Sequence, residues 1–428
     1  MTANRMSLRL LTAAAVVLTA TAAIGGCGRD STPNQTPTQT AAVTIDDSPA
    51  TGTIQVWAFN SEGEALAGLV EEFEKANPDV KVVVTPIPND ELPRKLEAAL
   101  ASGQVPDLVQ PSTALPSYVA AGGILPVPEG LIDQAGFFPA AIELNTVDGT
   151  LYSVPWYVTA QVFAYNADLA AEAGVEPPAT WDDVVAWAEA LRSAGAANPL
   201  TTNADVENSW QALLTFIIQA GGTVYENGEF KLDSPEMLAA CRHYASLFSS
   251  GASDASFLIE LAETIVQFGS GEIGSMQVPS YLYNYLRQGA PTPETIAITT
   301  LPAGPANYGS YFGGSGLSVP AEAPNPDAAW KFARFLAEPA SQAAFYEAGG
   351  VLPAARAAWE DPRLDSPGAP VFQEMLEASK APPNIPTWTQ IRSEISAVAE
   401  QLAHGVLTPE EAVVAMQAKA VEIGDGRQ

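Results

Sequence analysis

Hydrophobic positions from residue 53 onward alternate between two spacings, one typical of strands and one typical of helices. Residues 53–57 form a short β-rich run, whereas the apolar side chains of residues 66–73 recur at helical spacing. Strands that alternate with helices are typical of a doubly wound α/β lobe, in which ligands sit at the carboxyl ends of the strands. The loops after Trp57 and Val109 are therefore candidate ligand loops. The alternation predicts strand 53–57, helix 63–76, strand 80–84, helix 92–102 and strand 107–109.

A second α/β set is predicted after residue 150, beginning with a strand over residues 162–165. Its first long helix follows Thr180, a favourable N-cap, and carries Asp182 and Asp183 in the first turn, where acidic side chains are stabilising. The 428 residues, of which 47% are hydrophobic, suffice for two domains of ordinary size. The other expected elements are a strand over 273–278 and helices over 181–193, 210–220, 235–250, 257–268, 326–336, 340–348, 371–379, 390–404 and 409–421.

The start of the chain has the layout of a secretory signal. Arg5 and Arg9 precede an apolar run over residues 10–24, which is too short to span a bilayer as a stable helix. We therefore expect residues 1–26 to be a signal peptide.

The expected signal peptide leads into Ile24-Gly25-Gly26-Cys27, which resembles the bacterial lipobox. In a lipobox the cysteine is lipidated and becomes the new N-terminus, so we expect a lipid anchor on Cys27. The alternative is an ordinary cleaved signal followed by an unrelated cysteine. Residues 27–52 are dominated by Ser, Thr, Pro, Gln and Asn, and we expect them to form a flexible polar linker.

The charge and the cysteines exclude several kinds of partner. The formal net charge is −30, and removal of the signal peptide would leave 17 basic against 49 acidic residues. A surface this acidic repels phosphate, so we expect no nucleic-acid partner and membrane contact only through the anchor. After Cys27 the chain has one thiol, Cys241, which we expect to be a small buried residue of a helix. With only His243 and His404 besides, far apart in the sequence, we expect no metal site and no cofactor.

A series of stretches follows, in order, the motifs of a family of transport receptors. The chain resembles the extracellular solute-binding proteins of ABC importers, in the group that includes maltose-binding protein, and the resemblance runs from about residue 53 to 423. Its landmarks are FEKANPDVKVVV (73–84), ASGQVPDLVQ (101–110), GTLYSVPWYVTAQVFAYNADLAAEAGVEPPATWDDV (149–184), QFGSGEIGSM (267–276), GGSGLSVPAEAPNPDAAWKFARFLAEPASQAAF (313–345), and NIPTWTQIRSEI (384–395) with GVLTPEEAVVAM (405–416).

The resemblance implies a two-lobed α/β fold of the type II periplasmic-binding-protein kind, with each lobe a sheet flanked by helices. The N-lobe would comprise residues 53–158 and 309–356, and the C-lobe residues 159–308 and 357–428. A small-molecule ligand, expected to be a mono- or oligosaccharide, would bind in the cleft as the lobes close. Together with the anchor, this implies a monomeric receptor at the outer face of the cell membrane, without enzymatic activity, that delivers its ligand to permease and ATPase subunits on other chains.

A sugar presents hydroxyl groups at its rim and C–H patches on its faces, so its site needs aromatic rings and hydrogen-bonding side chains. Trp388 falls where maltose-binding protein has its main stacking tryptophan, and Arg392 follows four residues later. No catalytic residue is expected. The ligand residues that the resemblance implies are Asn60, Glu62, Gln110, Ser112, Trp156, Tyr157, Thr159, Asp205, Glu207, Asn208, Tyr281, Tyr283, Gly313, Gly314, Ser315, Trp388 and Arg392.

Several of these residues leave the chemical class of the ligand undecided. Thr159 stands where maltose-binding protein has an acidic residue, so that protein's preference for maltodextrins is not carried over. On a strand, Tyr281, Tyr283 and Tyr285 would share one face and could stack sugars or bind Fe³⁺ as phenolates. On a helix the three rings would point in different directions.

Other ligands and activities follow from the same residues. Asp205, Glu207 and Glu62 would suit a polyamine, and a polyol phosphate is a further alternative. A surface glycosidase is disfavoured, because no general base and nucleophile can be assigned among so many carboxylates. Residues 269–274 spell GxGxxG, but a helix is expected before them and a strand after, the reverse of the dinucleotide-binding arrangement.

Overall fold

The computed structural model describes residues 45–257 and 261–427. Its first sheet has the predicted alternation of parallel strands and helices, with strand order β2-β1-β3. The predicted helix 63–76 was wrong at its start, because the chain turns into a helix immediately after β1. The elements are β1 (Gly52–Phe59), α1 (Asn60–Ala65), α2 (Ala67–Ala76), β2 (Val80–Ile87), α3 (Leu92–Ser102) and β3 (Leu108–Val109).

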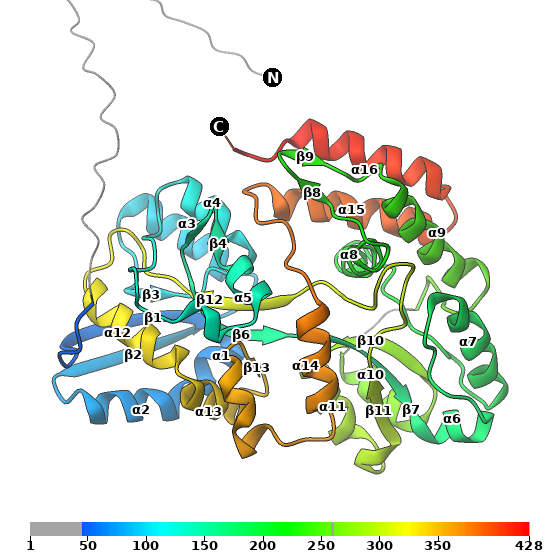
Figure 1. The fold of residues 1–428 in the computed structure, drawn as a ribbon, viewed down its shortest axis with the longest axis horizontal. Helices are drawn as coiled ribbons and strands as arrows, with labels where there is room; N and C mark the ends of the chain where they lie inside the picture. Colours follow the sequence, from blue (N-terminus) through cyan, green and yellow to red (C-terminus); the bar gives the residue numbers. More distant parts are fainter. Residues whose placement is uncertain (1–44, 258–260, 428) are drawn as a thin grey trace, which may run out of the picture. The chain divides into compact units, whose positions relative to one another are not determined.

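Two further sheets are joined by one continuous stretch of chain. Strand β6 (Val154–Thr159) is followed, after Ala160 alone, by β7 (Gln161–Asn166), and each is the central strand of its own sheet (Figure 1). All of their partners run antiparallel to them, so both sheets depend on this stretch. The partners of β6 are β12 (Gly313–Leu317) and β13 (Leu352–Pro353); those of β7 are β10 (Ser275–Pro279) and β11 (Ile296–Thr299).

Strand β12 passes β6 so closely that it has no room for side chains at two positions. Gly314 pairs with Val158 and has a φ of +139°, which is accessible to glycine but strained for other residues. A Cβ added there would overlap the carbonyl oxygen of Tyr157 and lie 2.9 Å from the Cα of Val158. A Cβ on Gly313 would collide with the Thr159 hydroxyl. The glycines of β12 are therefore required by contact with β6.

Helices make up most of the remaining chain. Helix α8 (Ser209–Gln219) is buried along nearly its whole length, as its apolar sequence predicts, because it packs between α9 and α15 while α16 packs on both of these (Figure 1). The other helices are α4 (Leu115–Ala120), α5 (Pro139–Leu144), α6 (Ala167–Ala173), α7 (Val184–Ser193), α9 (Pro235–Ser249), α10 (Leu261–Ser270), α11 (Ser280–Gly289), α12 (Pro326–Ala337), α13 (Pro339–Gly349), α14 (Ala369–Ala378), α15 (Trp388–Ala403) and α16 (Pro409–Ile423). Short elements are η1 (Ser112–Ala114), η2 (Gln134–Gly136), β4 (Thr146–Val147), β5 (Thr150–Leu151), η3 (Trp181–Asp183), β8 (Tyr225–Glu226), β9 (Glu229–Phe230), η4 (Pro293–Thr295), η5 (Arg356–Glu360) and η6 (Pro362–Leu364).

Most of the second α/β set was predicted within a few residues. The predicted helix 181–193 starts as a 3₁₀ turn, and Thr180 forms a capping box with Asp183. The GxGxxG stretch runs from the end of α10 to just before β10, so the expected order of helix and then strand is confirmed. Cys241 is fully buried on α9, as expected, and burial raises the pKa of its thiol to about 12.

Several predictions concern residues that the structure does not describe, or the division of the chain into lobes. The signal peptide, the lipobox with Cys27 and most of the linker lie outside the described residues. Among residues 45–257 and 261–427, no helix combines the length and apolar character needed to cross a bilayer. The residue bounds of the two lobes remain a prediction.

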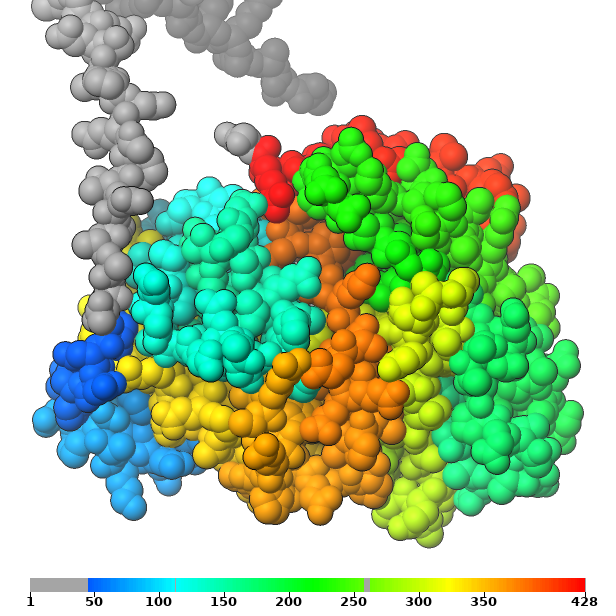
Figure 2. Space-filling view, in the orientation of Figure 1, coloured from blue at the N-terminus to red at the C-terminus, as the bar shows by residue number. Residues whose placement is uncertain are grey.

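The first described residues are fastened to α12 by a cluster of charges. Lys331 is only 6% exposed, and its Nζ lies 2.9 Å from Asp46 Oδ1 and 2.9 Å from Asp327 Oδ2. Arg334 reaches Asp47 at 3.2 Å. Figure 2 shows this blue start of the described chain lying against the yellow of α12. We call residues 46–48 with Lys331 and Arg334 the N-terminal latch.

Acid should release the N-terminal latch. Hydrogen bonds from Ser48 and then Lys331 lower the pKa of Asp46 to about 2. A carboxyl whose pKa is lower in the folded state stabilises that state above its unfolded pKa, at about pH 4, and the effect is lost as the pH falls toward 2. Hydrogen-exchange protection of residues 45–50 should therefore fall between pH 4 and pH 2, while Asp46→Asn should be poorly protected at both values. Equal protection of the native chain at both pH values would contradict this role of Asp46.

Candidate ligand-binding site

One side of the candidate site is a chain of hydrogen bonds at the carboxyl ends of β1, β3 and β6. The Tyr157 hydroxyl donates to Glu62 Oε1 at 2.9 Å and accepts from Gln110 Nε2 at 2.9 Å. Gln110 Oε1 in turn accepts from the backbone N–H of Phe59 at 3.0 Å, which fixes the orientation of the amide. Burial and the nearby Glu62 carboxylate raise the pKa of Tyr157 well above its usual range, so its hydroxyl stays a donor. The Glu62 carboxylate is thereby held in one position.

Two more tyrosines connect this side to the residues beyond β6. The Tyr311 hydroxyl accepts from Gln161 Nε2 at 2.9 Å and donates to Gln211 Oε1 at 3.0 Å. Tyr281 projects from α11 with 43% of its surface exposed. Partial burial, then the charge of Glu62, raises the pKa of Tyr281, which places its phenol within electrostatic reach of that carboxylate. Gln161, Tyr311 and Gln211 therefore form a second hydrogen-bonded group of tyrosine and amide side chains.

A separate hollow lies at the start of α8. Its polar and aromatic lining includes Glu207, Asn208, Trp210, Gln211 and Arg392. The Arg392 guanidinium lies 5.4 Å from the centre of the Trp210 ring, a cation–π arrangement. Burial is the main influence on Arg392 and lowers its pKa, although the group stays charged at neutral pH. Within the described residues Arg392 makes no ion pair, so its donors are free to meet a ligand in the hollow.

The structure brings some of the predicted ligand residues together. Glu62, Gln110 and Tyr157 form one hydrogen-bonded group, and Tyr281 lies near it. The second group is at the hollow. Its predicted members are Glu207, Asn208 and Arg392.

Other predicted aromatic residues are buried in packing contacts. Trp156 stacks on Phe345 with ring centres 4.4 Å apart. Trp388, at the start of α15, is 2% exposed and packs edge-on against Trp210 at 5.9 Å. Its indole N–H has no hydrogen-bond partner among the described residues. Contact of either tryptophan with a ligand remains a prediction.

The remaining predicted residues have mainly local roles in the structure. Asp205 Oδ1 accepts the backbone N–H groups of Glu207 and Asn208, both at 2.8 Å, and so organises the turn before α8. Asn60 is an exposed residue at the start of α1, and the side chain of Ser112 lies outside the described residues. The half-buried Thr159 ends β6, where it faces Gly313; Gly314 and Ser315 follow in β12, and Ser315 is 3% exposed.

The tyrosine series lies on a helix, α11, and its rings are scattered. Tyr281 and Tyr285 are exposed, whereas Tyr283 is 4% exposed and packs against Phe372. Residues two apart on a helix point to different sides, so the three phenols do not converge on one ion. No cluster of three His, Cys, Asp or Glu residues suited to a metal was found in the described part of the chain.

Sequence reasoning missed three polar residues that form a further hydrogen-bonded group beside the hollow. Gln161, Gln211 and Tyr311 are linked through hydrogen bonds between positions 100 and 150 residues apart. No local motif marks such pairs. Trp210 is buried but borders the hollow beside Arg392.

Comparison with known proteins identifies the family of the chain. The sequence pattern of one family, described as bacterial extracellular solute-binding protein, matches residues 68–371. A putative binding protein of Brucella abortus is 26% identical over 360 residues, covering 81% of this chain and 87% of the relative. The sn-glycerol-3-phosphate-binding periplasmic protein UgpB of Salmonella typhimurium is 26% identical over 406 residues, covering 85% and 90%.

A solved structure supports the same assignment at the level of the fold. The sugar-binding protein MalE of Xanthomonas citri superimposes with a TM-score of 0.79 at 27% identity, covering 87% of this chain and 97% of that one. The two-lobed type II architecture expected from the sequence is thus confirmed. The chain belongs to the bacterial extracellular solute-binding proteins.

Proposed function

We propose that this protein captures a carbohydrate outside the membrane for an ABC importer. The observation that carries the proposal is the combination of a hydrogen-bonded carboxylate, Glu62, with a cation on an aromatic ring, Arg392 on Trp210, each accompanied by tyrosine or amide side chains. Aromatic faces suit the C–H patches of a sugar, and the carboxylate, guanidinium and amides suit its hydroxyls. The lobes would close on the ligand and present it to permease subunits on other chains.

The remaining parts of the proposal rest on the sequence. Lipidation of Cys27 would hold the protein at the outer face of the cell membrane, and the linker would let it reach the permease. We further propose that it acts as a monomer and is not an enzyme. Membership of a family of transport receptors supports the latter.

A thermal-shift panel tests the ligand class. Monosaccharides and oligosaccharides, sn-glycerol 3-phosphate, spermidine and Fe³⁺ would each be added to the protein without its first 26 residues. A ligand that binds only the folded state raises the melting temperature, with about 2.7 kcal/mol of stabilisation at 100 times Kd. We expect a sugar to give the largest shift. A shift with spermidine or Fe³⁺ and none with any sugar would overturn the proposal.

One observation favours a second candidate, a phosphate ester of a polyol. Arg392 has no carboxylate partner within the described residues, and a guanidinium binds phosphate oxygens well. A relative of similar length is named for binding sn-glycerol 3-phosphate. In the same panel, a shift with sn-glycerol 3-phosphate but not with free sugars would select this candidate.

A further inference from the structure

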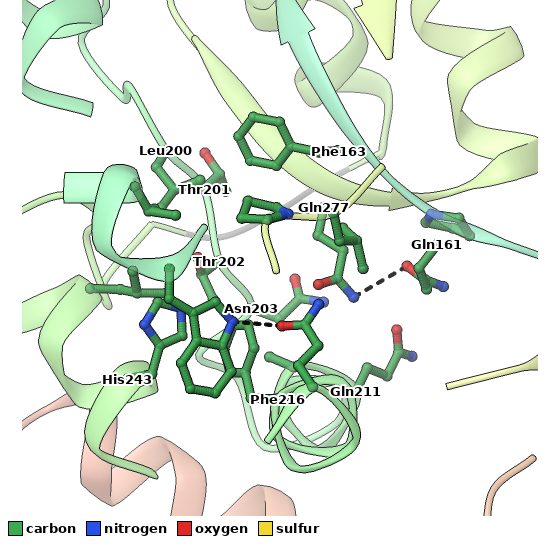
Figure 3. Close-up of a pocket in the computed structure, with 18 residues that line it drawn as sticks. Gln161, Phe163, Leu200, Thr201, Thr202, Asn203, Gln211, Phe216, His243 and Gln277 are labelled. Atoms are coloured by element: carbon green, nitrogen blue, oxygen red, sulfur yellow. Dashed lines mark hydrogen bonds between the residues drawn. The ribbon is translucent and has the colours of Figure 1, made fainter. Parts of the chain in front are cut away.

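A second cavity lies within the C-terminal α/β set, apart from the hollow beside Arg392. It is bounded by strands β7 and β10 on one side and by α8 and the Trp181 turn on the other (Figure 3). The space inside it that is open to the centre of a water molecule is about 80 Å³. Because one buried water needs roughly 10–15 Å³ of such space, the cavity holds several waters or one small organic molecule. Gln211 belongs to the walls of both the cavity and the hollow.

The lining of the cavity is polar but uncharged. Among the described residues that form it there is no Asp, Glu, Lys or Arg, whereas five amide side chains are present. His243 also lines it, and burial lowers the pKa of this imidazole to about 3, so the ring is neutral at physiological pH. Since a charged molecule would lose its hydration without gaining an opposite charge, the cavity favours an uncharged guest.

One wall is flat and rigidly held. The rings of Trp181 and His243 stack with centres 4.2 Å apart and an angle of 3° between their planes. Phe216 meets both rings edge-on. The indole N–H of Trp181 donates to Gln219 Oε1 at 2.6 Å, which fixes the ring in place. This wall offers an aromatic surface to the C–H face of a guest.

A hydroxyl on another wall lacks a partner. Thr201 is 5% exposed, and its Oγ1 is buried without a hydrogen bond among the described residues. An unsatisfied buried polar group costs roughly 1–3 kcal/mol, so native structures retain few of them. A guest hydroxyl that bonded to Thr201 would remove this cost.

We propose that this cavity is a second binding site, for a small uncharged polyol. Its hydroxyls would bond to Thr201 and to amides such as Gln277 and Gln211, while its carbon skeleton would lie on Trp181. The cavity contains neither Arg392 nor Glu62 and shares only Gln211 with the hollow, so a neutral polyol could bind in it whether or not the proposed function holds.

Fluorine NMR of protein labelled with 5-fluorotryptophan tests the proposal. The sequence has eight tryptophans, and Trp181→Phe identifies the signal of Trp181. The probes are glycerol and myo-inositol, with sn-glycerol 3-phosphate as a charged counterpart of glycerol. We expect saturable shifts of the Trp181 signal with the neutral probes at millimolar concentration and none with the phosphate ester.

Variants of the lining separate this site from the cleft. Thr201→Val keeps the shape but removes the hydroxyl, and should weaken binding of the neutral probe about fivefold without lowering the melting temperature. Ala212→Leu, on the buried wall of α8, should fill the cavity and abolish the shift. Arg392→Gln should leave the Trp181 response unchanged. A Trp181 signal that no neutral probe shifts, or a shift that Arg392→Gln removes while Thr201→Val does not, would overturn the proposal.

Discussion

Replacing Arg392 with glutamine should weaken binding of the cleft ligand by roughly 10- to 100-fold, because a hydrogen bond to a charged group contributes about 1.5–3 kcal/mol. The guanidinium borders the hollow beside Trp210 without a carboxylate partner among the described residues, so ligand oxygens would be its main acceptors. Isothermal titration with the ligand found in the thermal-shift panel would measure the loss. Arg392→Lys should restore only part of the affinity, because an ammonium lacks the planar fork of donors.

A matched control is available on α9. Arg242 is exposed, pairs with Glu410 at 2.7 Å and does not line the hollow, so Arg242→Gln removes the same charge and should leave affinity unchanged. The salt dependence of binding adds a second measurement. A polyol phosphate would lose affinity steeply with ionic strength, whereas a neutral sugar would not. Full affinity in a well-folded Arg392→Gln protein would remove this residue from the site.

Replacing Gly314 with alanine should destabilise the fold by at least about 3 kcal/mol. Two costs combine here: a φ of +139° that alanine tolerates poorly, and overlap of its Cβ with the backbone of β6. Neither the Tyr157 carbonyl nor the Val158 Cα can move aside without disturbing β6, the central strand of its sheet. The midpoint of urea unfolding, followed by circular dichroism, would report the loss.

Two other glycines separate the cost of backbone strain from the cost of overlap with β6. Gly122 has a φ of +70° with open space around its Cα, so Gly122→Ala should show the cost of backbone strain alone, about 1 kcal/mol. Gly68 lies in α2 with open space around it, and Gly68→Ala should stabilise by about 0.5–1 kcal/mol. If Gly314→Ala cost no more than Gly122→Ala, the close approach of β12 to β6 would not be a stability determinant.

The fold was predictable where it depends on short-range pattern. Helix α3 has the predicted limits, and β1 to β3 alternate with helices as expected, because apolar spacing records which face of each element is buried. The rule that ligands bind at the carboxyl ends of strands directed attention to Glu62 and Gln110, which the structure brings together through Tyr157, and their contact with a ligand stays a prediction.

The rest of the site depends on contacts that no local pattern records. Tyr311 meets Gln161 across 150 positions of sequence. The alternation of Tyr281, Tyr283 and Tyr285 is compatible with a strand, yet the segment is the helix α11, since Leu282, Tyr283 and Leu286 provide its buried face. The side of α15 on which Trp388 lies is set by the packing of that helix on α8, so the same tryptophan in the same motif can be buried or exposed.

The N-terminal latch determines which part of the molecule bears a mechanical load. A pull transmitted along the chain from residues before Ile45 arrives at Lys331 and Arg334 on α12, beside the sheet of β1. Helix α12 also packs on β6, which continues into β7 and so joins the two α/β sets. Tension on the lipid tether that we propose would therefore be borne first by the ion pairs of the N-terminal latch, before it reached β6 and β7.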